Sequence, residues 1–514
     1  MTPRIAALAL AAVLAAACTG APADGGRADA GAARGDRRDP SPSGPVVPPP
    51  TPIPRVTSAP VDWRAASCAL DVELVRRMRR GYMPGRSPDV MFAAREPNNF
   101  PSNHAGPWDY LQRVPLVFYG PGYVRARGDV ELAREATVAD LAPTLAELLH
   151  TPWPSDRAGR AVTEALVPAD RRPVPPRLVL TIVWDGGGWS GLETWPDAWP
   201  ELRAVMDRGT SVTNAIAGSS PSVTPPIHAS IGTGTFPKQH GIVDIPVRDG
   251  DDVVSSYDGR SPKYIAVPAL ADLYDAATGN VSKVVMFGYK TWHLGMIGHG
   301  AYSPGGDRDV AAIVEEDARV ITNPAYYSLP DYLVGFPGLD DHVRTVDAAD
   351  GRRDGKWLGG ADLGEVEAQR ASPVWSIRQT AMLQELVRRE GLGDDDVPDL
   401  VFTNYKHVDA VGHDYGLLSP EMESIIRYTD EQLAELVRFL DREVGRGEWV
   451  LALTADHGPA PDLPSKQGFP IHMQRLRAHT AAHFGLEADE LIQDERSTGF
   501  WLDRDVMAAT GVTP

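Results

Sequence analysis

Cysteine is nearly absent from this chain of 514 residues, which has only Cys18 and Cys68. Two cysteines exclude a disulfide framework and a cysteine-rich metal site, so the stability of the fold must come from a hydrophobic core. Basic residues are also scarce, because 50 lysines and arginines face 69 acidic residues and leave a net charge of −19. This balance argues against binding nucleic acid through its phosphate backbone, which needs clustered positive charge. It does not argue against phosphate chemistry, since bound cations can reverse a local field.

Long apolar runs are also lacking. The longest, residues 5–17, has 13 apolar residues, fewer than the roughly 20 that a membrane-spanning helix needs. It follows Arg4 and ends in small residues before Cys18, which is the pattern of an export signal over residues 1–18. Two interpretations stay open. The run of alanines at 15–17 suits ordinary signal peptidase, whereas small residues directly before Cys18 resemble a bacterial lipoprotein junction. We therefore expect an exported protein, either tethered to the cell membrane by a lipid on Cys18 or secreted or periplasmic.

Residues 19–60 contain mainly Pro, Gly, Ala and Asp, with almost no large apolar residue. Such a segment cannot bury enough surface to offset the entropy lost on ordering, so we expect a disordered linker. The chain after it is long enough for a large core, and we expect one catalytic domain over residues 61–514.

Short apolar runs rich in Val, Ile and Leu recur along this domain and end in polar or glycine-rich clusters. Continuous rather than alternating hydrophobicity is typical of strands covered on both faces, as in a parallel sheet. Helical patterns lie between them, at 137–150 and 419–444. We therefore predict a doubly wound α/β fold, with a mostly parallel central sheet, helices on both faces and an inserted cap-like segment. The runs are residues 88–94, 114–120, 177–184, 282–288, 398–405 and 448–455.

Three of these predicted strands end in residues suited to bind metal. Asp185 follows the run 177–184 and precedes three glycines. Asp409 and His413 come shortly after another run, four residues apart and so on one face of a helical turn. Asp456 and His457 follow a third run. Taken singly, the first is explained by turn chemistry and the second by a surface pair, whereas adjacent Asp and His at a strand end are rarer. Together the three favour a site, because ligands gather at the carboxyl ends of such strands. Oxygen and nitrogen ligands without thiolate suit zinc, with manganese or iron as alternatives.

Residues 219–242, SSPSVTPPIHASIGTGTFPKQHGI, make the resemblance to a known family specific. The order is strand-Asp-Gly, Thr-x-Pro-x-His, Thr-Gly-x-x-Pro-x-x-His-Gly-Ile, Asp-x-x-x-His and Asp-His-Gly. It is similar to that of the nucleotide pyrophosphatase/phosphodiesterase branch of the alkaline phosphatase superfamily, over about 280 residues from 178 to 458. The resemblance implies that Thr224 is the nucleophile and becomes transiently phosphorylated. The alternative is that the Thr224 hydroxyl only caps the helix that follows.

The resemblance further implies two divalent metal ions, for which zinc is the best fit. One would lie next to Thr224 and stabilise its alkoxide. The other would stabilise the leaving oxygen and then activate water. The first ion would be held by Asp185, Asp456 and His457, and the second by Asp409, His413 and one further histidine.

The further histidine lies well downstream of Asp-His-Gly in ordinary family members, yet the expected pattern is missing from the residues after Gly458. Residues 81–166 instead resemble that C-terminal segment and supply His104 as the ligand. The chain is thus expected to be circularly permuted, with residues 61–166 matching the family's C-terminal segment and residues 177–514 its N-terminal body. Permutation is cheap where natural termini lie close together. The competing ligands are His479 and His483, which an exposed helix face also explains.

Two departures limit what the resemblance says about substrate. Relatives place an Asn, which holds a phosphoryl oxygen, where this chain has Ile245. Lys290 is a candidate catalytic replacement, because some phosphomonoesterase relatives use a lysine near this place. A lysine beside the ions would stabilise charge on the phosphoryl oxygens, although a solvated surface lysine is an equal alternative.

The expected activity is hydrolysis of small-molecule phosphate mono- or diesters through a phosphothreonine intermediate. A phosphonate hydrolase on the same scaffold is an alternative, and so is an inactive envelope binding protein. A sulfatase is disfavoured because no cysteine lies near position 224. We expect no nucleic-acid-binding surface, and membrane contact only through a lipid anchor.

Overall fold

The computed structural model describes residues 65, 68–94, 100, 103–172, 174–300, 308–460 and 470–513. Residues 64–514 form one compact unit. The expected signal, linker and lipidation site at Cys18 all lie outside the described residues. No helix of the described part is both long and apolar enough to cross a membrane.

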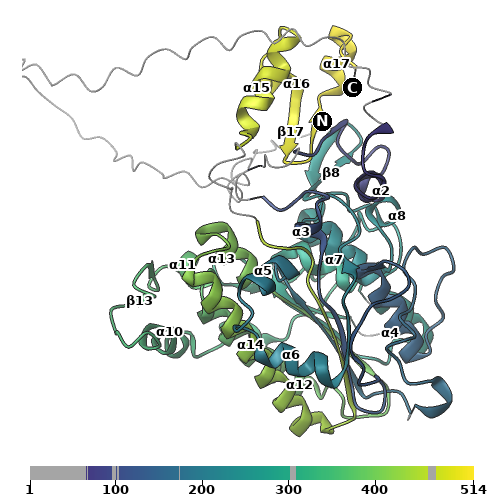
Figure 1. The fold of residues 1–514 in the computed structure, drawn as a ribbon, viewed down its shortest axis with the longest axis vertical. Coiled ribbons are helices and arrows are strands. Elements are labelled where there is room, and N and C mark those ends of the chain that lie inside the picture. The colour runs from purple at the N-terminus through teal and green to yellow at the C-terminus, as the bar shows by residue number, and fades with distance from the viewer. Residues whose placement is uncertain are drawn as a thin grey trace, which may run out of the picture. The chain divides into compact units, whose positions relative to one another are not determined.

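A nine-stranded sheet is the centre of the described part (Figure 1). Its middle strands, β11, β10, β15, β5 and β16, all run parallel to one another. The flanking strands include antiparallel pairs, β11 with β12, β16 with β2 and β2 with β6. In spatial order the strands are β12 (Val320–Ile321), β11 (Val310–Val314), β10 (Val284–Tyr289), β15 (Asp399–Tyr405), β5 (Leu178–Trp184), β16 (Trp449–Thr454), β2 (Leu116–Tyr119), β6 (Thr210–Val212) and β3 (Gly128–Val130).

Helices separate most of these strands along the chain, whereas β3 follows β2 directly and β12 follows β11 directly. The helices at the two predicted helical patterns are α4 (Leu141–Leu149) and α14 (Pro420–Leu440). The other α-helices of the described residues are α2 (Val72–Gly81), α3 (Asp109–Gln112), α5 (Trp189–Thr194), α6 (Pro200–Arg208), α7 (Thr224–Thr233), α8 (Pro237–His240), α9 (Leu270–Thr278), α10 (Leu339–Ala348), α11 (Val366–Arg370), α12 (Pro373–Glu390), α13 (His407–Tyr415), α15 (Met473–His483), α16 (Ala488–Leu491) and α17 (Arg504–Thr510).

Both faces of the sheet are buried, which explains the continuous apolar runs of its strands. In β16, Val450 and Ala452 join the hydrophobic cluster that contains α4, α7 and α9. The alternate residues Leu451 and Leu453 join a second cluster, which contains α5, α6, α12 and α14. The predicted α/β class, with a large and mostly parallel central sheet covered by helices, is therefore confirmed (Figure 1).

Two strands of the sheet come from the segment before residue 167. Only one of them, β2, comes from an apolar run that the sequence predicted as a strand. The run 114–120 forms β2, which is antiparallel to its neighbour β16. The run 88–94 forms only β1 (Val90–Met91), which pairs with β18 (Gly499–Leu502) outside the central sheet. The second strand is instead β3, a short edge strand that pairs with β6. The prediction for 88–94 was wrong because an apolar run does not reveal which sheet it joins.

A smaller three-stranded sheet contains β1, β18 and β17 (Ile492–Arg496). Its own hydrophobic cluster includes residues of α15 and α16 and is separate from the two clusters of the central sheet. The remaining pairs are short hairpins or bridges between distant segments. They are β4 (Ala136–Thr137) with β7 (Ala215–Ile216), β8 (Pro246–Asp249) with β9 (Asp252–Ser255), and β13 (Lys356–Trp357) with β14 (Ala361–Asp362).

The stretch at 246–397 belongs largely to the main fold. It supplies β10, β11 and β12 to the central sheet and α12 to one of its faces. The hairpin β13–β14 and α10 lie apart from the sheet in Figure 1, beyond α12 and α14.

Candidate active site

Three neighbouring parallel strands deliver charged residues to one edge of the central sheet. Residues 399–405 of β15 pair in register with 178–184 of β5, and 449–454 of β16 pair with 178–183. The strands therefore end side by side, and the next residues are Lys406, Asp185 and, two positions after β16, Asp456. All three are buried. The predicted gathering of site residues at the carboxyl edge thus follows from the strand register.

The glycine after Asp185 lets these ends come close together. Gly186 has φ of 71°, in the left-handed region that glycine adopts without strain. A Cβ at this position would lie 2.9 Å from the Cα of Asp409. The Gly186 N–H also donates to Asp456 Oδ1 at 3.1 Å. The turn therefore fixes both neighbouring carboxylates relative to Asp185.

The first ligand group consists of Asp185, Asp456 and His457, all fully buried. His457 Nε2 lies 3.5 Å from Asp185 Oδ1 and 3.2 Å from Asp456 Oδ2. The other nitrogen, Nδ1, is 3.0 Å from the carbonyl of Gly458 and donates to it. This hydrogen bond orients Nε2 toward the carboxylates, as a backbone carbonyl commonly does for a metal-binding imidazole.

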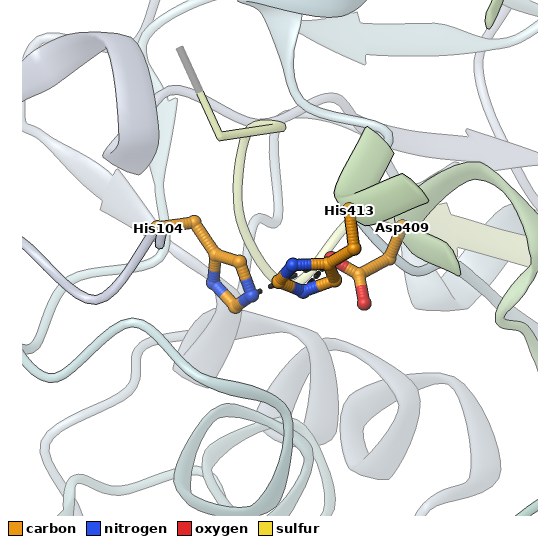
Figure 2. A group of neighbouring side chains, drawn as sticks. All are labelled: His104, Asp409 and His413. Atoms are coloured by element: carbon orange, nitrogen blue, oxygen red, sulfur yellow. Dashed lines mark ion pairs between the residues drawn. The ribbon is translucent and has the colours of Figure 1, made fainter. Parts of the chain in front are cut away.

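The second group consists of His104, Asp409 and His413, whose side chains point toward one another in Figure 2. The Nε2 atoms of both histidines lie 3.4 Å from Asp409 Oδ1. Asp409 and His413 are four residues apart on α13, so they share one helix face as predicted. His104 comes from the distant N-terminal segment, and its Nδ1 donates to the carbonyl of Ser222 at 3.0 Å. Burial lowers the pKa of His104 and keeps the ring neutral, as a metal ligand must be.

The two groups are neighbours, and both fit divalent metal ions. The rings of His104 and His457 stack with centroids 3.6 Å apart. Apart from each other, Asp456 Oδ2 and His457 Nε2 have no hydrogen-bond partner among the described residues, although both are buried. Unpartnered buried atoms of this kind are costly unless a cation binds them. Burial, followed by the charge of Asp456, raises the pKa of Asp185 to about 7.

Thr224 is the first residue of α7 and lies beside the first group. Its Oγ1 is 3.5 Å from Asp185 Oδ2, and its side chain is buried. The helix cap is Val223, and no side-chain capping bond is present. The alternative in which the hydroxyl only caps the helix therefore has no support from the geometry.

Lys406 was missed by sequence reasoning, although it contacts both ligand groups and the candidate nucleophile. Its Nζ donates to Asp185 Oδ1 at 2.9 Å, to Asp409 Oδ2 at 2.6 Å and to Thr224 Oγ1 at 3.0 Å. Burial lowers the pKa of Lys406, but the three surrounding carboxylates outweigh burial and raise it above its ordinary value. The signal in the sequence was a lysine directly after a buried strand and three residues before Asp409.

Lys290, the lysine that the sequence singled out, points elsewhere. Its Nζ lies 2.7 Å from Glu316 Oε1 and 4.6 Å from the ring centre of Trp292. No hydrogen bond joins it to Thr224 or to either ligand group in the described part. The competing ligands His479 and His483 are exposed on α15 and belong to none of the candidate metal groups of the described residues.

A third group of possible ligands shares Asp185 and adds His228 and His293, both buried. His228 belongs to the Thr-x-Pro-x-His motif, but the sequence assigned it no role. Asn404 Nδ2 lies between the acceptors of this group, donating to Asp185 Oδ2 at 3.0 Å and to His228 Nε2 at 2.9 Å. Asn404 therefore holds Oδ2 of the Asp185 carboxylate, whereas Lys406 contacts Oδ1.

The arrangement places a buried hydroxyl beside two clusters of side chains that could hold metal ions. The sequence profile of the type I phosphodiesterase / nucleotide pyrophosphatase family matches residues 179–478, more than half of the chain. The chain therefore belongs to this family, whose members, like its alkaline phosphatase relatives, are phosphoric ester hydrolases. The family resemblance read from the motifs is confirmed.

Two alkaline phosphatases are among the similar proteins. PafA of Elizabethkingia meningoseptica is 25% identical over 391 residues, which cover 65% of this chain and 70% of PafA. PhoV of Synechococcus elongatus is 25% identical over 331 residues, which cover 55% of this chain and 59% of PhoV. The crystal structure of wild-type PafA shares the fold, with a TM-score of 0.55 and 22% identity over 66% of this chain and 74% of that one.

Proposed function

We propose that this protein hydrolyses phosphate mono- or diesters of small molecules, with Thr224 as nucleophile and two divalent ions as cofactors. The observation that carries the proposal is the position of Thr224 Oγ1. It is buried 3.5 Å from a carboxylate of the first ligand group and shares Lys406 with the second group. Family membership supports the reaction class, and the two alkaline phosphatase relatives agree with it.

The two ligand groups would each hold one ion, and zinc suits their oxygen and nitrogen atoms. When bound, such ions supply positive charge that stabilises the attacking and leaving oxygens of a displacement at phosphorus. The chain itself supplies the orientation. The carbonyls of Ser222 and Gly458 hold the rings of His104 and His457, and Gly186 holds Asp456.

The reaction has two displacements at phosphorus. In the first, Thr224 Oγ loses its proton to solvent and forms a bond to phosphorus, while the bond from phosphorus to the leaving oxygen breaks. The leaving group takes up a proton from solvent and departs, and the phosphoryl group stays on Thr224. In the second, a water oxygen attacks phosphorus and gives up a proton to solvent, the Thr224 Oγ–P bond breaks, Thr224 regains a proton from solvent, and the phosphate product departs. Each displacement breaks one P–O bond and forms one.

The proposal is tested by measuring the activity of metal-loaded protein on an aryl phosphate monoester, an aryl phosphodiester and a phosphonate monoester. We expect turnover of a phosphate ester that chelation abolishes and zinc restores, together with phosphate trapped on Thr224 at low pH. Activity that survives exhaustive chelation would contradict the metal requirement. A phosphonate turned over far faster than either ester would favour the alternative phosphonate hydrolase.

We also infer that the chain is circularly permuted relative to its family. The family profile covers residues 179–478, yet β2, β3 and the ligand His104 all come from the segment before residue 167. A segment outside the matched region thus completes both the sheet and the second ligand group. This is expected if residues 61–166 correspond to the C-terminal segment of other family members.

We propose, from the sequence, that the protein is exported and anchored by a lipid on Cys18. Cys18→Ser should then move the protein from the membrane fraction to the soluble fraction without changing its specific activity. Equal partitioning of the mutant and the parent protein would exclude Cys18 as the anchor.

A further inference from the structure

Lys406 is placed to contact the group that is transferred, not only the side chains that bind metal. Its Nζ is 3.0 Å from Thr224 Oγ1, the atom that would bond to phosphorus. A phosphoryl group on that oxygen would bring its non-bridging oxygens within hydrogen-bond reach of the ammonium. The strand end holds the backbone of Lys406 in place, because Asp185 N–H donates to the carbonyl of Tyr405 at 3.0 Å.

Two donor positions beside Thr224 carry no donor in this chain. A helix N-terminus usually offers free backbone N–H groups to a phosphate. In α7 the second and third residues are Pro225 and Pro226, which have no N–H. Ile245 has no polar side-chain group at the position where relatives have an amide. The non-bridging oxygens therefore need a donor from elsewhere.

Lys290 does not supply this donor in the structure. Its ammonium lies 2.7 Å from Glu316 Oε1, and no hydrogen bond of the described residues joins it to Thr224. Lys406 is instead hydrogen-bonded to the nucleophile and to one carboxylate of each ligand group.

We propose that Lys406 is a catalytic residue that donates to the non-bridging phosphoryl oxygens and makes phosphate monoester dianions the preferred substrates over diesters. The proposal rests on the proposed function and names its substrate class. A monoester dianion carries twice the formal charge of a diester on the phosphoryl group. The Coulomb attraction to one fixed ammonium is therefore about twice as large for the monoester. In a buried site this difference is weakly screened.

A competing role for Lys406 is that of a counter-ion that only keeps Asp185 and Asp409 in place. The two roles differ in what the loss of the lysine does. Loss of a counter-ion would disturb the ligand groups and would slow both ester classes alike. Loss of a contact to the phosphoryl oxygens would slow monoester hydrolysis much more than diester hydrolysis.

The experiment compares kcat/KM for an aryl phosphate monoester and an aryl phosphodiester with the same leaving group, using metal-loaded full-length protein. Lys406→Met removes the charge but keeps the chain length, and Lys406→Arg keeps the charge. Lys290→Met tests the other candidate lysine. Lys263→Met is the matched control, because Lys263 is exposed and pairs only with surface groups. Metal content and inhibition by inorganic phosphate are measured for each variant.

We expect the wild type to prefer the monoester. Lys406→Met should lower monoester kcat/KM by about 10²–10³-fold, the scale for loss of one donor to a developing oxyanion, and diester kcat/KM by about tenfold or less. Inhibition by inorganic phosphate should weaken in this variant with two ions still bound. Lys406→Arg should keep most of the monoester preference, and Lys290→Met should change it less than Lys406→Met does.

Equal losses for both esters in Lys406→Met, or a larger change of preference in Lys290→Met, would overturn the proposal. A wild type that prefers the diester would overturn it without any variant. All three results are compatible with the proposed function, because phosphate esters are still hydrolysed. If the metal-loaded wild type hydrolysed neither ester, the proposed function itself would be contradicted.

Discussion

Two segments of this chain contribute unequally to the same site. Residues 177–460 carry Thr224, Lys406 and five of the six residues in the two ligand groups. The segment before residue 167 carries only His104. Yet this segment also places β2 between β16 and β6 in the central sheet. The comparison teaches that the smaller contributor is not an accessory module, because both the sheet and the second ligand group are incomplete without it.

Removal of the N-terminal segment should have the largest effect, because both the sheet and the second ligand group depend on it. A chain that starts near Pro176 would lose β2 and β3, which would leave β16 unpaired on one side and β6 without either of its strand partners. Loss of β2, whose residues are fully buried, would expose an apolar edge of the sheet. Such an edge favours aggregation. We expect insoluble protein, measured by the soluble fraction after expression. The control is a chain that lacks only residues 1–60, which should be soluble, and a soluble, active shorter chain would refute the permutation.

The next largest effect should come from the body of the chain. Thr224→Ala removes the proposed nucleophile and should lower kcat on the order of 10⁴–10⁶-fold, as loss of a nucleophile does in other hydrolases. The thermal midpoint should change little, because the Thr224 hydroxyl caps no helix and Lys406 keeps its hydrogen bonds to Asp185 and Asp409. Thr224→Ser, which keeps a hydroxyl, is the control and should retain measurable turnover. Near-normal rates in the alanine variant would exclude a phosphothreonine intermediate.

A single substitution in the N-terminal segment sharpens the comparison further. His104→Ala should remove about one bound ion per chain and lower activity by about 10²–10³-fold, since a charge stabiliser is lost. Metal content and kcat measured on the same preparation test this. His479→Ala on α15 is the matched control and should leave both unchanged, because His479 is exposed and outside the ligand groups. Loss of an ion in His479→Ala alone would assign the ligand to the C-terminal helix.

The difference between the two segments also shows what the sequence could and could not predict. Asp185, Asp456 and His457 follow buried strands, and strand register brings such ends together. His104 follows no strand of the body, so only its likeness to a displaced family segment pointed to it. The direction of β2 was not predictable, because an apolar run is the same in a parallel and an antiparallel pair.

Lys406 shows a different limit. A lysine after a strand is ordinary in composition, and only the fold reveals that three carboxylates surround it. The sequence singled out Lys290 because it lies near a position where relatives have a lysine. Its partner Glu316 is 26 residues further along the chain, and no sequence pattern predicts that the two side chains meet. Short strands such as β3 and β6, with three residues each, also have too few side chains for a recognisable pattern.

The smallest effect is expected when the two segments exchange places. Residues 61–166 would be moved behind Pro514 with a short flexible linker, and the signal and residues 19–60 would precede residue 167. The new junction is plausible because β1 of the N-terminal segment already pairs with β18, near the end of the chain. The contacts of β2 and His104 depend on position in space and not on chain order, so kcat/KM and the number of bound ions should stay within about threefold of the parent, apart from a small change in loop-closure entropy. The same rearrangement with His104→Ala should lose activity as the parent does. A rearranged chain that folds but binds one ion fewer would show that the present order, and not only the presence of the segment, is needed to place His104.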